Sequence, residues 1–125
     1  MKLLTREQIV NAKDIKSVIV PCPEWGGSVS VQGLTLEEKD EWSLSISEDK
    51  GVSIKGATAK LCALCMRGDK GKLLFSLDDI EVLQAKSALP MDRIFQAAQE
   101  LTGIGQGEVE EAVKNSEKTP TEGSD

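Results

Sequence analysis

The sequence predicts an α+β fold that is predominantly α-helical, with a small antiparallel β-hairpin near the N-terminus. Valines alternate with other residues in two short runs, 18–21 and 28–32, on either side of a Pro-Glu-Trp-Gly-Gly turn, a pattern typical of a hairpin with one apolar face. Further along the chain, apolar residues recur every three or four positions, as in amphipathic helices. The 125 residues are most simply one domain. We assign it to residues 1–115 and expect the polar tail, 116–125, to be disordered.

A short helix is predicted before the hairpin. Thr5 and Gln8 have the spacing of a capping box, in which the side chain of each residue binds the backbone N–H of the other. This spacing predicts a helix over 6–12. Ile9 and Val10 are its apolar residues, and we expect them to form its buried side.

The hairpin is followed by a second capping box. Thr35 and Glu38 predict the start of a helix over 36–46, whose apolar positions are Leu36, Trp42 or its neighbour, and Ile46. Four carboxylates crowd its first turns, but successive helix positions point in different directions, so we interpret them as a solvated face rather than a metal or acid/base site. They are Glu37, Glu38, Asp40 and Glu41.

Apolar periodicity predicts four more helices, over 53–66, 77–86, 88–101 and 108–114. The first has a wide apolar stripe from Ile54 to Cys65 and is expected to be the central core helix. Ile80, Val82 and Leu83 are expected to form the buried side of the second. The helix over 88–101 is the most regular of the four. Its apolar face carries Met91, Ile94, Phe95, Ala98 and Leu101, and its polar face carries Asp92, Arg93, Gln96 and Gln99.

The cysteines do not form a disulfide framework, because their number is odd: Cys22, Cys62 and Cys65. Cys62 and Cys65 match the C-x-x-C spacing of thiol oxidoreductases and of half a zinc site. The pair lies in an apolar run, and the chain has neither a second C-x-x-C nor any histidine. We therefore favour buried, reduced thiols that pack as small apolar side chains.

Charge and composition narrow the functional classes. The formal charge of −6 disfavours a surface that neutralises nucleic-acid phosphates. No apolar run approaches the roughly 20 residues of a membrane span, and the first ten residues do not resemble a signal peptide. Without histidine, tyrosine or a nucleophile beside a base, we expect no enzyme, no cofactor and no metal. The residues themselves favour a cytoplasmic protein that holds other proteins.

Several segments in a fixed order carry a resemblance to a known family. The Pro-Glu-Trp-Gly-Gly turn is followed by Val-x-Val-x-Gly-Leu-Thr over 29–35, and later by Ala-Lys-Ser-Ala, Asp-Arg-Ile-Phe and Leu-Thr-Gly between 85 and 103. Together with the N-terminal helix, these segments resemble the tail assembly chaperones of long-tailed bacteriophages. The resemblance extends from about Thr5 to about Lys114.

The resemblance implies partners and a life cycle. Such chaperones bind the tape measure protein, keep it soluble, help recruit tail tube subunits in the host cytoplasm, and are absent from the finished virion. Many exist as a short form and a frameshifted longer form, and this chain resembles the short one, as encoded by a phage or prophage. The expected partners are therefore the tape measure protein, the tail tube protein, the longer form and further copies of the chain.

The contact surface remains a hypothesis at this point. Trp25 either covers the hairpin, the reading we favour, or anchors a partner as an exposed aromatic. We expect any partner surface to combine an exposed Trp25 with the polar side of the helix over 88–101, namely Arg93, Gln96 and Gln99. Two alternatives stay open: a small structural tail or head-tail connector protein of the virion, and a thiol or metal-binding protein using Cys62 and Cys65.

Overall fold

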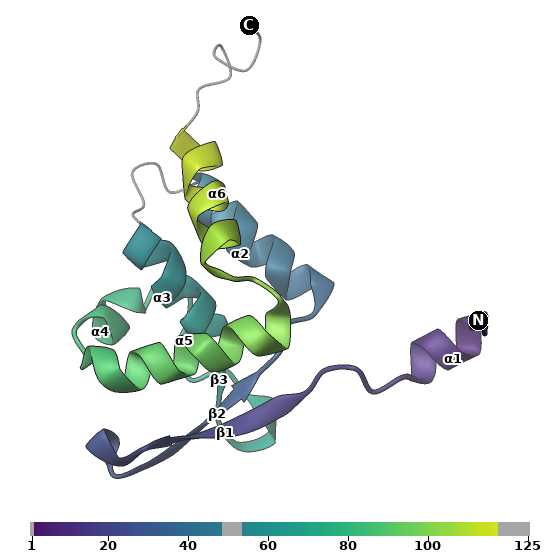
Figure 1. Ribbon diagram of the computed structural model, residues 1–125, viewed down its shortest axis with the longest axis horizontal. Helices are drawn as coiled ribbons and strands as arrows, with labels where there is room; N and C mark the ends of the chain where they lie inside the picture. The colour runs from purple at the N-terminus through teal and green to yellow at the C-terminus, as the bar shows by residue number, and fades with distance from the viewer. Residues whose placement is uncertain (1, 49–53, 118–125) are drawn as a thin grey trace, which may run out of the picture.

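The computed structural model describes residues 2–48 and 54–117 and shows a mainly helical α+β protein (Figure 1). The helices are α1 (Arg6–Asn11), α2 (Leu36–Glu48), α3 (Ile54–Cys65), α4 (Ile80–Gln84), α5 (Ala88–Thr102) and α6 (Gln106–Glu117). The strands are β1 (Ser17–Cys22), β2 (Gly27–Gln32) and β3 (Met66–Arg67). The 3-10 turn η1 (Pro23–Trp25) connects β1 to β2, and a second, η2 (Asp69–Gly71), follows β3. The predicted fold class is confirmed.

The strands form one antiparallel sheet in the order β1-β2-β3. β1 pairs with β2 over its whole length, so that Val18 lies opposite Val31 and Val20 opposite Val29. These four valines share one face of the sheet, which confirms the predicted hairpin. In the connecting turn Gly26 has φ +80°, whereas Gly27, which we also expected at positive φ, is the first residue of β2.

Gly33, which follows the hairpin, contacts both the residue before β1 and the end of α5. Its N–H donates to the Lys16 carbonyl at 2.9 Å, just before β1 begins. A Cβ at this position would lie 3.2 Å from the backbone oxygen of Leu101 in α5. The absence of a side chain therefore lets the start of β1, the end of β2 and the end of α5 meet closely.

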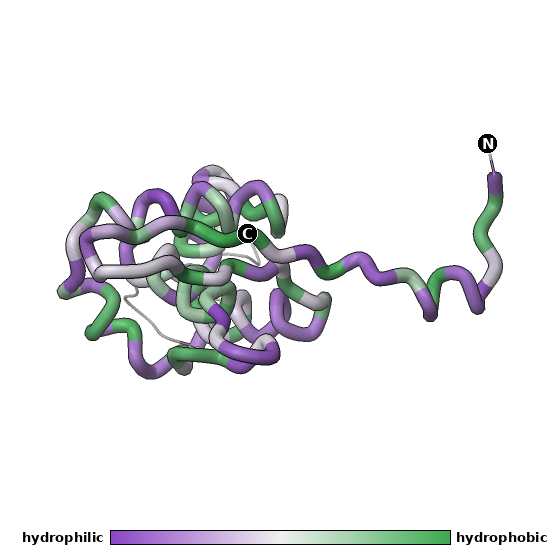
Figure 2. Tube along the Cα trace, turned by 90° about the horizontal axis from the view of Figure 1, so that it is seen from below, coloured by the Kyte–Doolittle hydropathy of each residue, from purple (hydrophilic) through white to green (hydrophobic). Residues whose placement is uncertain are grey.

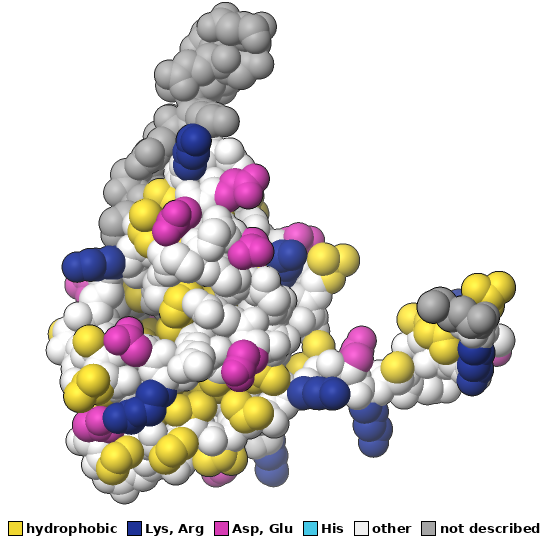
Figure 3. All heavy atoms as spheres, in the orientation of Figure 1, with side chains coloured by type: hydrophobic (Ala, Val, Ile, Leu, Met, Phe, Trp, Pro, Cys, Tyr) yellow, Lys and Arg dark blue, Asp and Glu magenta, His cyan; other side chains and the backbone are white. Residues whose placement is uncertain are grey.

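An N-terminal arm, which we define as residues 2–16, extends from this point away from the body (Figures 1 and 2). The predicted capping box is present: the Thr5 N–H donates to Gln8 Oε1 at 3.0 Å, and the Gln8 N–H donates to Thr5 Oγ1 at 3.2 Å. The predicted burial is wrong. Ile9 is 60% and Val10 64% exposed, and Figure 3 shows apolar side chains open to solvent on the arm. Periodicity identifies the apolar side of a helix but not what covers it.

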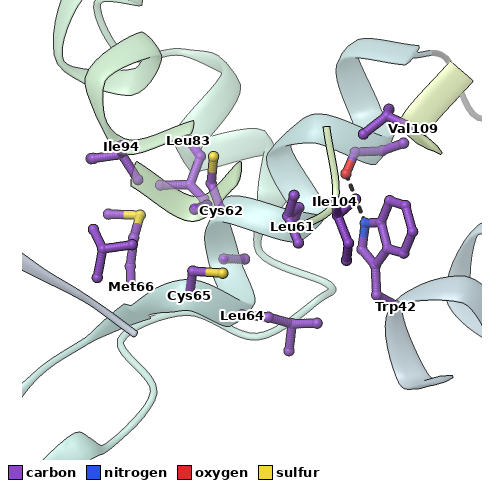
Figure 4. Close-up of a cluster of buried hydrophobic side chains, with 14 of the residues drawn as sticks. Trp42, Leu61, Cys62, Leu64, Cys65, Met66, Leu83, Ile94, Ile104 and Val109 are labelled. Atoms are coloured by element: carbon purple, nitrogen blue, oxygen red, sulfur yellow. Dashed lines mark hydrogen bonds between the residues drawn. The ribbon is translucent and has the colours of Figure 1, made fainter. Parts of the chain in front are cut away.

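The core surrounds α3, as predicted. All its residues from Ala59 to Cys65 are buried, because α2, α4, α5 and α6 all pack against it. Figure 4 shows its side chains among Leu83 of α4 and Ile94 of α5. On another side the Trp42 indole N–H donates to the Ala57 carbonyl at 3.0 Å, which joins α2 to α3.

Several element boundaries and burial assignments differ from the sequence prediction. α4 begins at Ile80, because Ser76 accepts from the Asp78 N–H in a turn that precedes the helix. Val82, expected in the core, is 47% exposed, and the first residues of two helices, Leu36 and Ile54, are 77% and 40% exposed. α6 continues to Glu117, past the predicted limit of the domain. Residues 49–53, where we predicted most of a loop and the start of the α3 helix, and 118–125, most of the tail, lie outside the described residues.

Candidate functional site

A bidentate ion pair ties the hairpin turn to α5. The Arg93 guanidinium donates from Nη1 to Glu24 Oε1 at 2.9 Å and from Nη2 to Glu24 Oε2. Nη1 also donates to the Pro21 carbonyl at 3.1 Å. Parallel guanidinium–carboxylate bonds fix orientation as well as distance. The turn that carries Trp25 is therefore held in one position relative to α5.

The pair changes the acidity of both partners. Hydrogen bonds from Arg93 lower the pKa of Glu24 to about 2, and the same bonds raise the pKa of Arg93. Glu24 is consequently ionised throughout the physiological range, since charge-assisted hydrogen bonds favour the charged form. We call this ion pair the clamp, and it is intact throughout that pH range.

The structure brings together only part of the predicted partner surface. Trp25 is 37% exposed, and Arg93 is linked to its turn through Glu24. Gln96 is exposed, but Gln99 is only partly so, and its carbonyl accepts from the Gly103 N–H that ends α5. Arg93, predicted as a partner-contact residue, positions the turn, and its charge is already paired with Glu24.

Sequence reasoning missed one apolar member of this surface. Leu89 is 65% exposed and lies one helical turn before Arg93 on α5. Residues four apart project from the same side of a helix, so Leu89 and Arg93 share a face, and Gln96 continues it. The spacing was readable in the sequence. We call Trp25, Leu89, Arg93 and Gln96 the Trp25 surface.

A second ion pair, which the sequence did not reveal, lies at the opposite end of the hairpin. Arg67, 8% exposed, donates to Glu38 Oε2 at 2.7 Å and to the carbonyls of Leu64 and Gly71. Partial burial alone would raise the pKa of Glu38, but hydrogen bonds from Arg67 and the Thr35 N–H hold it below its usual value. Glu38 is thus a structural residue. The prediction that it belongs to a solvated face is wrong.

Among the surface grooves, two have a mainly apolar lining surface. One, of about 590 Å³, lies between α2 and α6 and is lined by Trp42, Leu44 and Ala112 with polar and charged residues at its edge. The other, of about 410 Å³, lies between α3, α4 and α5, and its apolar lining includes Met91 and Phe95. The charged residues that line the first groove are Lys39, Asp40, Glu108 and Glu111, and those that line the second are Lys55, Lys86 and Asp92.

The cysteines are placed as the favoured interpretation predicted. Cys22, Cys62 and Cys65 are free thiols, each fully buried. Burial raises the pKa of Cys62 and of Cys65 to about 12, and a protonated thiol is neither a nucleophile nor a metal ligand. Within residues 2–48 and 54–117, no three His, Cys, Asp or Glu residues are grouped so that they could hold a metal ion.

Comparison with known proteins gives no relative. No protein-family model, no curated protein sequence and no solved structure matches the chain. Among the described helices, none has both the length and the apolar character needed to cross a membrane. The assignment of function therefore depends on the sequence resemblance and on the surfaces described above.

Proposed function

We propose that the protein is a tail assembly chaperone of a long-tailed phage or prophage, which binds the tape measure protein and keeps it soluble until tail tube subunits are recruited. The observation that carries the proposal is the Trp25 surface. It presents an aromatic and an aliphatic side chain to solvent, and the clamp from Arg93 to Glu24 holds their two elements together. Such preorganised apolar anchors with a polar edge suit the capture of an apolar helix.

The proposed mechanism is masking rather than chemistry. An elongated client with exposed apolar helices aggregates unless those faces are covered. Trp25 and Leu89 would contact the apolar side of a client helix, and Gln96 would offer its amide at the edge. The net charge of −6 would keep the coated complex soluble through mutual repulsion. Several copies along one client would multiply weak contacts.

Recovery of soluble tape measure protein on co-expression tests the proposal. We expect Trp25→Ala and Leu89→Ala each to lower recovery severalfold relative to the wild-type chain. Val82→Ala is the matched control, because Val82 is also an exposed apolar residue, 47% exposed, but lies on α4. Unchanged recovery with both Trp25→Ala and Leu89→Ala would refute the surface, and no recovery by the wild-type chain would refute the function.

Arg93 calls for a separate design, since its role is to position the turn. Arg93→Glu should reduce recovery by repelling Glu24. Adding Glu24→Arg to the same chain restores an ion pair of reversed polarity and should restore most of the recovery. If the double variant stays as poor as Arg93→Glu alone, Arg93 contacts the client directly.

Mass spectrometry of purified virions then separates a chaperone, which should be scarce there, from a structural connector.

A further inference from the structure

The N-terminal arm has the features of a docking segment that is not packed against the described part of its own chain. α1 has six residues and no buried residue, whereas isolated helices shorter than about 12 residues are marginal in water. Its start is nevertheless strongly encoded. Besides the capping box, Leu4 and Ile9 occupy the two positions of a hydrophobic staple. A helix that is specified so carefully requires a surface to pack against.

The apolar side chains of the arm are unusually open. Leu3 is 90%, Leu4 62%, Ile9 60% and Val10 64% exposed, and in Figures 1 and 2 the arm is directed away from the body. Solvent-exposed aliphatic residues gathered on one short segment mark an interaction site. The arm thus needs an apolar groove on another molecule.

Charge identifies the groove. Residues 1–16 contain four basic and two acidic side chains, a formal charge of +2, and since the whole chain carries −6, the remaining residues carry −8. The α2–α6 groove has Asp40, Glu108 and Glu111 against a single cation, Lys39. Figure 3 shows acidic side chains gathered over α6. The basic arm and this acidic groove are therefore complementary.

The second groove, between α3, α4 and α5, does not share this complementarity. Its charged residues are Lys55, Lys86 and Asp92, so it carries the same sign as the arm. At about 590 Å³ the α2–α6 groove is also the larger, within the range of roughly 300–1,000 Å³ of pockets that enclose small ligands. Its apolar lining of Trp42, Leu44 and Ala112 suits aliphatic side chains. A third hollow, of about 460 Å³, has the same charge balance but only Leu44 and Leu77 as apolar lining residues, so it suits them less well.

From these observations we propose that the N-terminal arm of one copy docks its apolar side into the α2–α6 groove of a second copy of the chain. Ile9 and Val10 enter the groove, and Arg6 lies against its acidic edge. Electrostatic complementarity of this kind sets the register of the contact and disfavours the groove between α3, α4 and α5. The contact concerns the purified protein alone, so its test does not depend on any client.

Light scattering during gel filtration over a hundredfold dilution range gives the first test. The wild-type chain should associate at high concentration, and Ile9→Asp with Val10→Asp should raise the dissociation constant by at least about tenfold. Val82→Asp, which introduces the same charge at an exposed residue outside both the arm and the α2–α6 groove, should leave the dissociation constant unchanged. A wild-type chain that is monomeric throughout, or an arm variant that associates normally, would overturn the proposal.

Charge reversal tests the groove itself. Arg6→Glu and Glu111→Lys should each weaken association, because each places like charges at the contact. Both substitutions in one chain restore opposite charges between copies and should recover most of the affinity. Both residues are exposed, so folding is not at risk. Failure of the double variant to recover would show that the arm binds elsewhere.

Disulfide trapping then distinguishes two copies from one. A chain with Val10→Cys and a differently tagged chain with Ser43→Cys, which lines the groove, should form a mixed disulfide on oxidation. Val10→Cys with Gln84→Cys, in the other groove, should form little. If instead only a single chain carrying both Val10→Cys and Ser43→Cys becomes oxidised, the arm folds onto its own body and the proposal is wrong.

Discussion

Arg67 and Glu38, 29 residues apart in sequence, form an ion pair of 2.7 Å that joins α2 to β3. Arg67 also donates to the Leu64 and Gly71 carbonyls. The guanidinium thus satisfies three acceptors from separate parts of the chain in a region where water is scarce. Removing one partner of such a buried pair lowers the free energy of unfolding, because the other partner is left without its hydrogen bond.

Replacing Arg67 with Met should lower the free energy of unfolding by about 2–4 kcal/mol, because it leaves Glu38 Oε2 and two carbonyls without the guanidinium donor, while Glu38 Oε1 keeps the Thr35 N–H. The figure is below the largest values for buried pairs, since Glu38 keeps 22% of its side chain exposed. Lys39→Met, next to Glu38 but exposed, is the control and should change stability by less than about 0.5 kcal/mol. Urea denaturation measures both, and equal midpoints would contradict the role given to Arg67.

The clamp on the Trp25 turn should open in acid. Arg93 lowers the pKa of Glu24 to about 2, so the contribution of the pair is complete above the ordinary glutamate pKa and is lost as the pH falls from about 4.5 toward 2. The Trp25 indole resonance should follow this titration, while that of buried Trp42 serves as the internal reference. In Glu24→Gln the Trp25 dependence should vanish. A Glu24 carboxyl that titrates near 4.5 would show that the clamp is absent in solution.

The three thiols should be unreactive in the folded protein. Burial raises the pKa of Cys62 and Cys65 to about 12 and also raises that of Cys22, so the thiolate that attacks a disulfide reagent is scarce. At pH 8 labelling should await unfolding, and in concentrated urea all three cysteines should react. Rapid native labelling at the rate of a model thiol would restore the thiol-protein alternative.

The two tryptophans should differ sharply in their contribution to stability. Trp42→Phe removes the donor to the Ala57 carbonyl and leaves space in the core, which should cost about 2–3 kcal/mol. Trp25→Phe, on a residue that is 37% exposed, should cost less than about 0.5 kcal/mol. Thermal or urea unfolding of the two variants makes the comparison directly. Similar losses would mean that Trp25 is structural, as the sequence first suggested.

Features that depend on contacts between residues close in sequence could be predicted. Both capping boxes, the hairpin and the apolar face of α5 follow from spacing alone, because those contacts span only a few residues or repeat with a fixed period. Cysteine burial also followed, since Cys62 and Cys65 lie in an apolar run.

Long-range relationships were not readable. Nothing near Glu38 in the sequence indicates that Arg67 will reach it, and nothing near Glu24 indicates Arg93, because tertiary packing decides both pairs. The exposure of Ile9 and Val10 was missed for the converse reason: an apolar face predicts burial only where the chain supplies a cover. The Trp25 surface was therefore predicted in part, without Leu89 and without the clamp.

The tight meeting of backbones at Gly33 sets the origin of the arm. The Gly33 N–H donates to the Lys16 carbonyl, and Gly33 packs against the end of α5. The root of the arm, where it leaves the body, is therefore fixed in position. Residues 12–16, at about 3.5 Å each when extended, let α1 travel within a radius of roughly 17 Å of that root. A neighbouring molecule is in range only if its own groove falls inside this small sphere, which limits how two bodies can sit beside each other.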